Sequence, residues 1–95
     1  PMLQVQFVDS FEEAIAVANN TKYGLAAGLI SDNKYLFDEF VDRINAGVIN
    51  FNSTTTGASG AFPFGGIGRS GNLRPAGFYA ADYCAWPKAS IIKQL

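Results

Sequence analysis

Glycines are concentrated in residues 61–71 of the 95-residue chain, which read Ala-Phe-Pro-Phe-Gly-Gly-Ile-Gly-Arg-Ser-Gly. Glycine adopts positive φ angles and lets other atoms approach the backbone closely, so this density predicts a tight loop packed against another part of the protein. Phe62 and Phe64 would anchor the loop on their apolar side. Loops anchored in this way are good candidates for the wall of a binding or catalytic site.

Residues 66–71 also match the G-x-G-x-x-G pattern of dinucleotide-binding proteins. That pattern has this meaning only between a strand and a helix, with an acidic residue about 20 positions further on. Here Pro63 interrupts the preceding residues, Pro75 follows soon after, and Asp82 is the only later acid. We therefore favour a glycine loop shaped for close packing over a dinucleotide site.

A second polar loop, residues 54–59, reads Thr-Thr-Thr-Gly-Ala-Ser. The backbone amides of Gly57 and Ala58 could form a concavity that binds an anion, and the Ser59 hydroxyl would add a donor. A solvated loop without function would have the same composition, so the residue types leave both interpretations open. Asn52, just before this loop, could orient the loop backbone or approach the site, and we favour a structural role in the turn.

Several other chemistries are excluded by composition. The chain contains no histidine, which removes histidine metal sites and Ser-His or Cys-His catalytic pairs. The single cysteine, Cys84, cannot form an internal disulfide and fits a reducing, cytoplasmic compartment. Without an activating neighbour, we expect it to be a buried structural thiol. Arg69 and Arg74 could attract an anionic substrate, although solvated surface arginines are commoner.

The net charge and the length of the chain limit its binding partners and the size of its fold. Seven basic and eight acidic residues give a net charge of −1, which argues against a nucleic acid or an anionic membrane as partner. The longest uncharged stretch, residues 44–68, is too rich in Gly, Ser, Thr and Asn to cross a bilayer. The length corresponds to one domain at most, with a modest core.

The apolar pattern predicts alternating strands and helices up to residue 51. Residues 3–7 alternate as a strand with one wet face, and Ser10 with Glu13 forms a capping box before a helix over 11–18. Residues 25–30 indicate a buried strand. A second helix, capped within 31–33, buries a face and ends at Gly47, and residues 48–51 form the third strand. The buried face comprises Phe37, Phe40, Val41 and Ile44, and Glu39 would pair with Arg43. This order favours an α/β fold with a largely parallel sheet.

The remainder of the chain is less regular. Residues 52–72 show no periodicity, which is typical of a functional or disordered loop, and the apolar side chains within them favour order. Residues 78–85 indicate a short helix, and residues 89–94 a terminal strand that would pair outside this domain.

Several segments resemble consecutive parts of the NAD(P)-dependent aldehyde dehydrogenases. They are residues 18–28 (Ala-Asn-Asn-Thr-Lys-Tyr-Gly-Leu-Ala-Ala-Gly), 46–52 (Ala-Gly-Val-Ile-Asn-Phe-Asn), the Pro-Phe-Gly-Gly at 63–66 and the Ser-Gly at 70–71. The resemblance covers essentially the whole chain. Residues 71–75 and 79–87 are most similar to the succinylglutamate semialdehyde dehydrogenases of arginine catabolism.

The resemblance implies a fold and an origin. Residues 1–95 would be a C-terminal fragment of the catalytic domain, a partial doubly wound three-layer α/β sandwich, with residues 86–95 as a tail for homo-oligomerisation. The family's nucleophilic cysteine, general-base glutamate and NAD-binding domain lie upstream. The fragment would therefore contain no catalytic residue, bind no NAD or metal itself, and be inactive alone.

The resemblance also implies a site. Enzymes of this kind that act on acidic semialdehydes use a Gly-Ala turn, here Gly57-Ala58, to hold the distal carboxylate of the substrate, with Ser59 beside it. Phe64 would line the substrate tunnel, or anchor the glycine loop, or do both. The parent enzyme would oxidise succinylglutamate semialdehyde to succinylglutamate with NAD. The alternative is a non-catalytic α/β module that associates with itself through its terminal strand.

Overall fold

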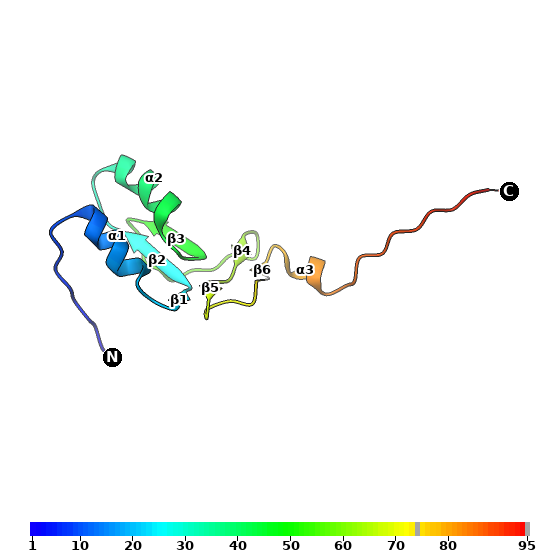
Figure 1. The fold of residues 1–95 in the computed structure, drawn as a ribbon, viewed down its shortest axis with the longest axis horizontal. Coiled ribbons are helices and arrows are strands. Elements are labelled where there is room, and N and C mark those ends of the chain that lie inside the picture. The colour runs from blue at the N-terminus through cyan, green and yellow to red at the C-terminus, as the bar shows by residue number, and fades with distance from the viewer. Residues whose placement is uncertain (74, 95) are drawn as a thin grey trace.

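Two helices and a parallel pair of strands form the packed end of an elongated molecule (Figure 1). The computed structural model describes residues 1–73 and 75–94. The molecule measures 72 × 32 × 22 Å, and its radius of gyration is 18.4 Å. A compact chain of this length would have a radius of about 12 Å. The difference arises from the two ends, which leave the packed part as extended chain (Figure 1).

Helix α1 (Phe11–Asn19) begins at the predicted cap. The Ser10 side chain accepts a hydrogen bond from the Glu13 amide at 3.1 Å. The return bond of the capping box differs by one residue, because the Glu13 carboxylate accepts from the amide of Asp9 at 3.0 Å. The acidic first turn, Glu12 and Glu13, also suits the positive end of the helix dipole.

Helix α2 (Lys34–Arg43) begins at Asn33, whose side chain accepts from the Tyr35 amide at 3.0 Å. The predicted end at Gly47 is wrong: the helix ends at Arg43 because Ile44 is already extended. The backbone of Gly47 instead lies so close to the carbonyl of Gly65 that a Cβ could not be accommodated. The glycine is required there by a tertiary contact.

The core forms where the two helices meet the strands. Ile15 of α1 is buried together with Phe40 and Ile44, as the helical spacing predicts, and Val41 is half-exposed. Strand β2 (Ala26–Leu29) pairs in parallel with β3 (Val48–Phe51). Alternate residues of these strands pack against the core: Ala27 and Leu29 of β2 and Ile49 of β3. The helices therefore cover one face of the pair, which confirms the α/β class, and the other face carries Val48 and Asn50.

The glycine-rich segment is ordered by two short antiparallel pairings. Strand β1 (Tyr23–Gly24) pairs with β5 (Ile67–Gly68), and β4 (Pro63–Phe64) pairs with β6 (Ala76–Gly77). Strand β5 thus lies inside the G-x-G-x-x-G stretch and leads into a turn, which differs from a dinucleotide-binding unit. The Ser70 hydroxyl accepts from the Gly24 amide at 3.1 Å and fastens the loop. Close packing of this loop is confirmed.

Two predicted strands do not form. Residues 3–7 and 89–94 have no regular structure, and Leu3 and Phe7 are 86% and 94% exposed. Alternating apolar residues form a strand only where a neighbouring strand accepts their hydrogen bonds, and within the described part of the chain none does.

The C-terminal helix and the cysteine also differ from expectation. Helix α3 (Ala80–Tyr83) is shorter than the predicted 78–85. Cys84 follows it and is exposed, so the prediction of a buried thiol is wrong. The reason is that this end of the chain extends away from the core (Figure 1). Across residues 1–73 and 75–94 no helix has the length and apolar character needed to span a membrane.

Candidate functional site

A cavity of about 480 Å³ lies beside β3 and the loop that follows it. It brings together all four residues that the sequence analysis assigned to substrate: Gly57, Ala58, Ser59 and Phe64. The rest of the lining comprises Gly47, Val48, Ile49, Asn50, Phe62 and Pro63. The cavity therefore lies next to the strand pair and between the two loops that the sequence indicated.

Two backbone amides, those of Gly57 and Ala58, lie at the loop tip beside the cavity. Gly57 has a φ of +106°, a conformation that favours glycine, and no atom lies within 4 Å of the position a Cβ would take. Within the described residues, the amides of Gly57 and Ala58 donate no hydrogen bond to the protein. Two donors are thus available beside the cavity, where an anion could accept from both.

Ser59 forms the turn that ends this loop. Its hydroxyl oxygen accepts from the Ala61 amide at 3.2 Å, and its carbonyl accepts from the Phe62 amide at 3.2 Å. Because a hydroxyl can accept and donate at the same time, its proton is still able to donate to a ligand. Phe64 is 38% exposed, lines the cavity and belongs to β4. It lies outside the buried core.

Two asparagines hold the base of the loop: Asn50 lies in β3, and Asn52 directly follows that strand. The side chain of Asn50 donates from Nδ2 to the Thr54 carbonyl at 2.6 Å. The side chain of Asn52 contacts both backbone polar groups of Ser31. The sequence indicated a structural role for Asn52, without its partner Ser31, and gave no role to Asn50. The available signal was a polar amide in an apolar strand, Val-Ile-Asn-Phe.

No charged side chain lines this cavity among the described residues. Arg69 lies elsewhere, in the glycine loop, where its amide donates to the Lys22 carbonyl at 2.8 Å. Arg74, the other arginine considered for an anionic substrate, is outside the described residues. An anion in the cavity would therefore be held by backbone amides and hydroxyls. In residues 1–73 and 75–94 no group of three His, Cys, Asp or Glu side chains could hold a metal ion.

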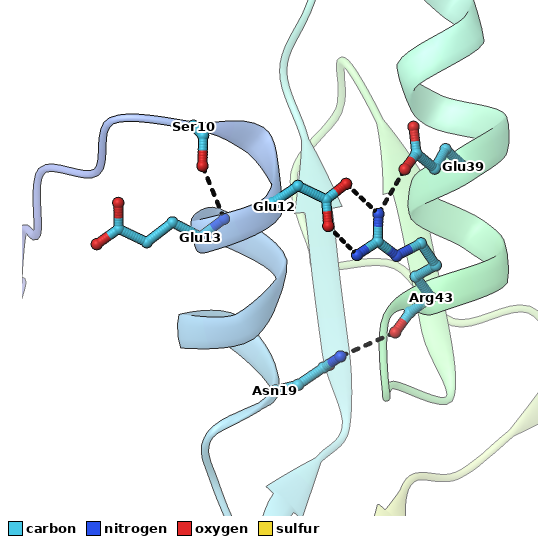
Figure 2. A network of polar contacts seen from close by, with 6 residues as sticks. All are labelled: Ser10, Glu12, Glu13, Asn19, Glu39 and Arg43. Atoms are coloured by element: carbon cyan, nitrogen blue, oxygen red, sulfur yellow. Dashed lines mark hydrogen bonds and ion pairs between the residues drawn. The ribbon is translucent and has the colours of Figure 1, made fainter.

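The principal ion-pair network connects the two helices (Figure 2). Arg43 of α2 makes a two-pronged contact with Glu12 of α1 at 2.5 and 2.6 Å, and also contacts Glu39 at 2.5 Å, as predicted. The hydrogen bond from Arg43 holds the pKa of Glu12 below its ordinary value. Hydrogen bonds to Glu12 and Glu39 raise the pKa of Arg43. None of these side chains lines the cavity, so the network supports the fold.

Comparison with known proteins decides the family. Residues 1–89 match the aldehyde dehydrogenase family. This chain belongs to the aldehyde dehydrogenase family. N-succinylglutamate 5-semialdehyde dehydrogenase 2 of Caulobacter vibrioides is 62% identical over 91 residues, which are 96% of this chain and 19% of that protein. The chain thus spans about a fifth of the curated aldehyde dehydrogenases it matches, and the predicted resemblance is confirmed.

Solved aldehyde dehydrogenases share the fold. The NAD⁺ complex of the enzyme from Bacillus cereus is 40% identical with a TM-score of 0.72, over 79% of this chain and 15% of that one. Aldehyde dehydrogenase 21 from Physcomitrella patens, in complex with the reaction product succinate, is 28% identical with a TM-score of 0.71, over 79% and 16%. The strands and helices described above are therefore part of an aldehyde dehydrogenase domain.

Proposed function

We propose that this chain is the C-terminal part of the catalytic domain of a cytoplasmic, NAD-dependent enzyme of arginine catabolism. The whole enzyme oxidises succinylglutamate semialdehyde to succinylglutamate. The identity to a relative of that name supports this substrate, and the NAD⁺ complex at 40% identity supports the cofactor. NAD would supply the oxidant of the reaction and would be held by residues outside this chain. The described residues do not fit NAD, because the glycine loop continues from an antiparallel strand without a following helix.

The shared cavity carries this proposal. A substrate with a carboxylate at the end remote from the aldehyde needs donors at a fixed distance from the reacting carbon. Gly57 and Ala58 offer two amides that donate to no other described residue, and Ser59 offers a hydroxyl, at one side of the cavity. Phe64 offers an aromatic surface for the methylene part of the substrate. This chain therefore positions the substrate, while bond-breaking groups come from the rest of the enzyme.

The C-terminal tail, residues 86–95, has a second proposed role, in association of subunits. Trp86, Ile91 and Ile92 are exposed along the extended residues 86–94. We assign residues 86–95 to a contact between identical subunits. The chain alone has no activity, and neither nucleic acid nor membrane is a partner. The competing function, a self-associating module without catalysis, is favoured by the same exposed tail and would leave the cavity without a role.

The test replaces the loop-tip residues in the full-length enzyme. Proline at position 57 cannot adopt the φ of +106°, and aspartate at position 58 would repel a carboxylate. We expect Gly57→Pro and Ala58→Asp to raise KM for the acidic semialdehyde roughly tenfold, equivalent to about one charge-assisted hydrogen bond. KM for a neutral aldehyde of similar length should change less than twofold.

Gly60→Ala is the matched control, because the position has ordinary φ and open space for a methyl group. It should leave both KM values unchanged. If the two loop-tip variants raise KM equally for acidic and neutral aldehydes, the loop does not bind the carboxylate.

A further inference from the structure

The side chain of Asn52 continues the strand pairing beyond the end of the sheet. The Ser31 amide donates to Asn52 Oδ1 at 2.9 Å, and Asn52 Nδ2 donates to the Ser31 carbonyl at 2.8 Å. The Asn52 amide also donates to the Leu29 carbonyl at 2.8 Å. A side-chain amide thus satisfies the donor and the acceptor of one backbone residue, just after the last strand pair, Leu29 with Phe51.

We call these two hydrogen bonds between the Asn52 side chain and the Ser31 backbone the clamp. The clamp lies where the chain changes direction. Asn52 has a φ of +49°, in the left-handed region that asparagine tolerates better than most residues. The backbone leaves β3 there and enters residues 53–60. The two bonds to Ser31 fix the side chain, and through it the direction in which the loop starts.

The loop beyond Asn52 is otherwise held near its two ends. The Thr54 and Thr56 hydroxyls hydrogen-bond at 2.8 Å, and Ser59 closes the turn at the far end. Asn50 holds the Thr54 carbonyl, and a methyl group on Gly28 would lie 3.4 Å from Thr55 Cγ2, so the first loop residues lie over β2. At the tip, the neighbourhood of Gly57 is open. Within the described part of the chain, the position of the tip is therefore set from its base.

We propose that Asn52, assisted by Asn50, is a positioning residue that determines the preference for acidic over neutral aldehydes. This inference rests on the proposed function, because it concerns where the Gly57 and Ala58 amides stand. With the clamp, the amides are preoriented for a carboxylate. Without it, the loop has to be ordered when the substrate binds, and affinity for the carboxylate falls. A neutral aldehyde does not use these amides and is not affected.

The decisive variant in the full-length enzyme is Asn52→Gly, which keeps the left-handed turn and removes the clamp. We expect KM for the acidic semialdehyde to rise roughly fivefold to tenfold, the effect of losing a hydrogen-bonded constraint. KM for a neutral aldehyde of similar length should change less than twofold, with kcat for both substrates nearly constant. Asn45→Ala is the control, because the Asn45 side chain makes no hydrogen bond with the described residues.

A second variant and a second measurement distinguish the positioning effect from a folding defect of Asn52→Gly. Asn52→Asp keeps the acceptor for the Ser31 amide but places a second acceptor oxygen against the Ser31 carbonyl, so it should also raise the acidic KM. Hydrogen exchange of the amides in residues 53–58 should be faster in both Asn52 variants and unchanged in Asn45→Ala. Loss of order in the loop is then visible without turnover.

Each outcome decides between the two ideas. If Gly57→Pro raises the acidic KM and neither Asn52 variant does, the positioning role is wrong and the proposed function stands. If Gly57→Pro also leaves the acidic KM unchanged, the carboxylate site and the positioning role both fail. An equal rise of both KM values in the Asn52 variants, or exchange in residues 53–58 that matches the unaltered enzyme, likewise overturns the inference.

Discussion

Some residues of the candidate site present hydrogen-bond donors, and other residues hold those donors in place. The candidate carboxylate site uses neutral groups: two backbone amides and the hydroxyl of Ser59. Neutral donors bind a carboxylate without the desolvation cost of a buried cation, and they discriminate by geometry. The charged side chains of the packed end are used elsewhere, since Arg43 and Glu12 connect the two helices. Chemistry and stability thus depend on different residues.

The Glu12–Arg43 pair gives stability that depends on pH. Since the folded pKa of Glu12 lies below its unfolded value, the stabilisation is fully present above about pH 4.3, the ordinary value for glutamate. It is lost as pH falls through the folded pKa. In the full-length enzyme, Glu12→Gln should lower the unfolding temperature at pH 7, and the difference from the unaltered enzyme should vanish on acidification. Differential scanning calorimetry at a series of pH values measures this difference in unfolding temperature.

Asp42→Asn on α2, next to Arg43, is the control, because within the described residues Asp42 forms no ion pair. It should reproduce neither the loss at neutral pH nor its disappearance in acid. A Glu12→Gln difference that is constant with pH would mean that the ion pair does not contribute.

At the scale of elements, backbone contacts between loops determine where glycine is required. Gly47 precedes β3 and faces the carbonyl of Gly65, while Gly71 faces the carbonyl of Gly66. These contacts seat the glycine loop against the start of β3, beside the cavity. Cβ atoms at such positions would force the two segments apart and displace the cavity wall that carries Phe64.

Gly47→Ala should therefore destabilise the full-length enzyme by about 1–3 kcal/mol, the usual cost of overpacking. Gly60→Ala, where a methyl group meets no atom, should be neutral. Chemical denaturation of both variants makes the comparison. Equal stability of the two variants would show that Gly47 and Gly65 are not in contact in the full-length enzyme.

The elements that sequence predicted correctly depend on local signals. Ser10 and Asn33 cap helices through bonds to residues two or three positions away, and the βαβ order fixes the pairing of β2 with β3. The strand expected at residues 3–7 did not form, because strand formation requires a partner that local pattern does not supply.

The candidate site was likewise predictable where its signals are local and not where it depends on a distant contact. The family resemblance implied Gly57 to Ser59 and Phe64 as site residues, and the structure places them in one cavity. The clamp was not predictable in the same way, because Asn52 and Ser31 are 21 positions apart and meet only through the register of β2 and β3. Asn52 could be recognised as a turn residue, but not as a contact between two segments.

The whole molecule exposes more apolar surface than a free-standing domain would. Three hydrophobic residues are buried, whereas large side chains such as Phe7, Leu73 and Trp86 are open to solvent among the described residues. A second cavity of about 470 Å³ is lined mainly by apolar side chains around α3, including Tyr79 and Trp86. Surfaces of this extent mark contacts with other protein. They agree with a chain that spans 19% of its relative and completes a larger enzyme.

The most direct test is a crystal structure of the full-length enzyme with succinylglutamate bound. A carboxylate oxygen remote from the reacting carbon should lie about 3 Å from the amide nitrogens of Gly57 and Ala58. The Ser59 hydroxyl should donate to the same group, and the Phe64 ring should contact the methylene chain. A carboxylate held entirely by other residues, with residues 54–59 turned to solvent, would contradict it.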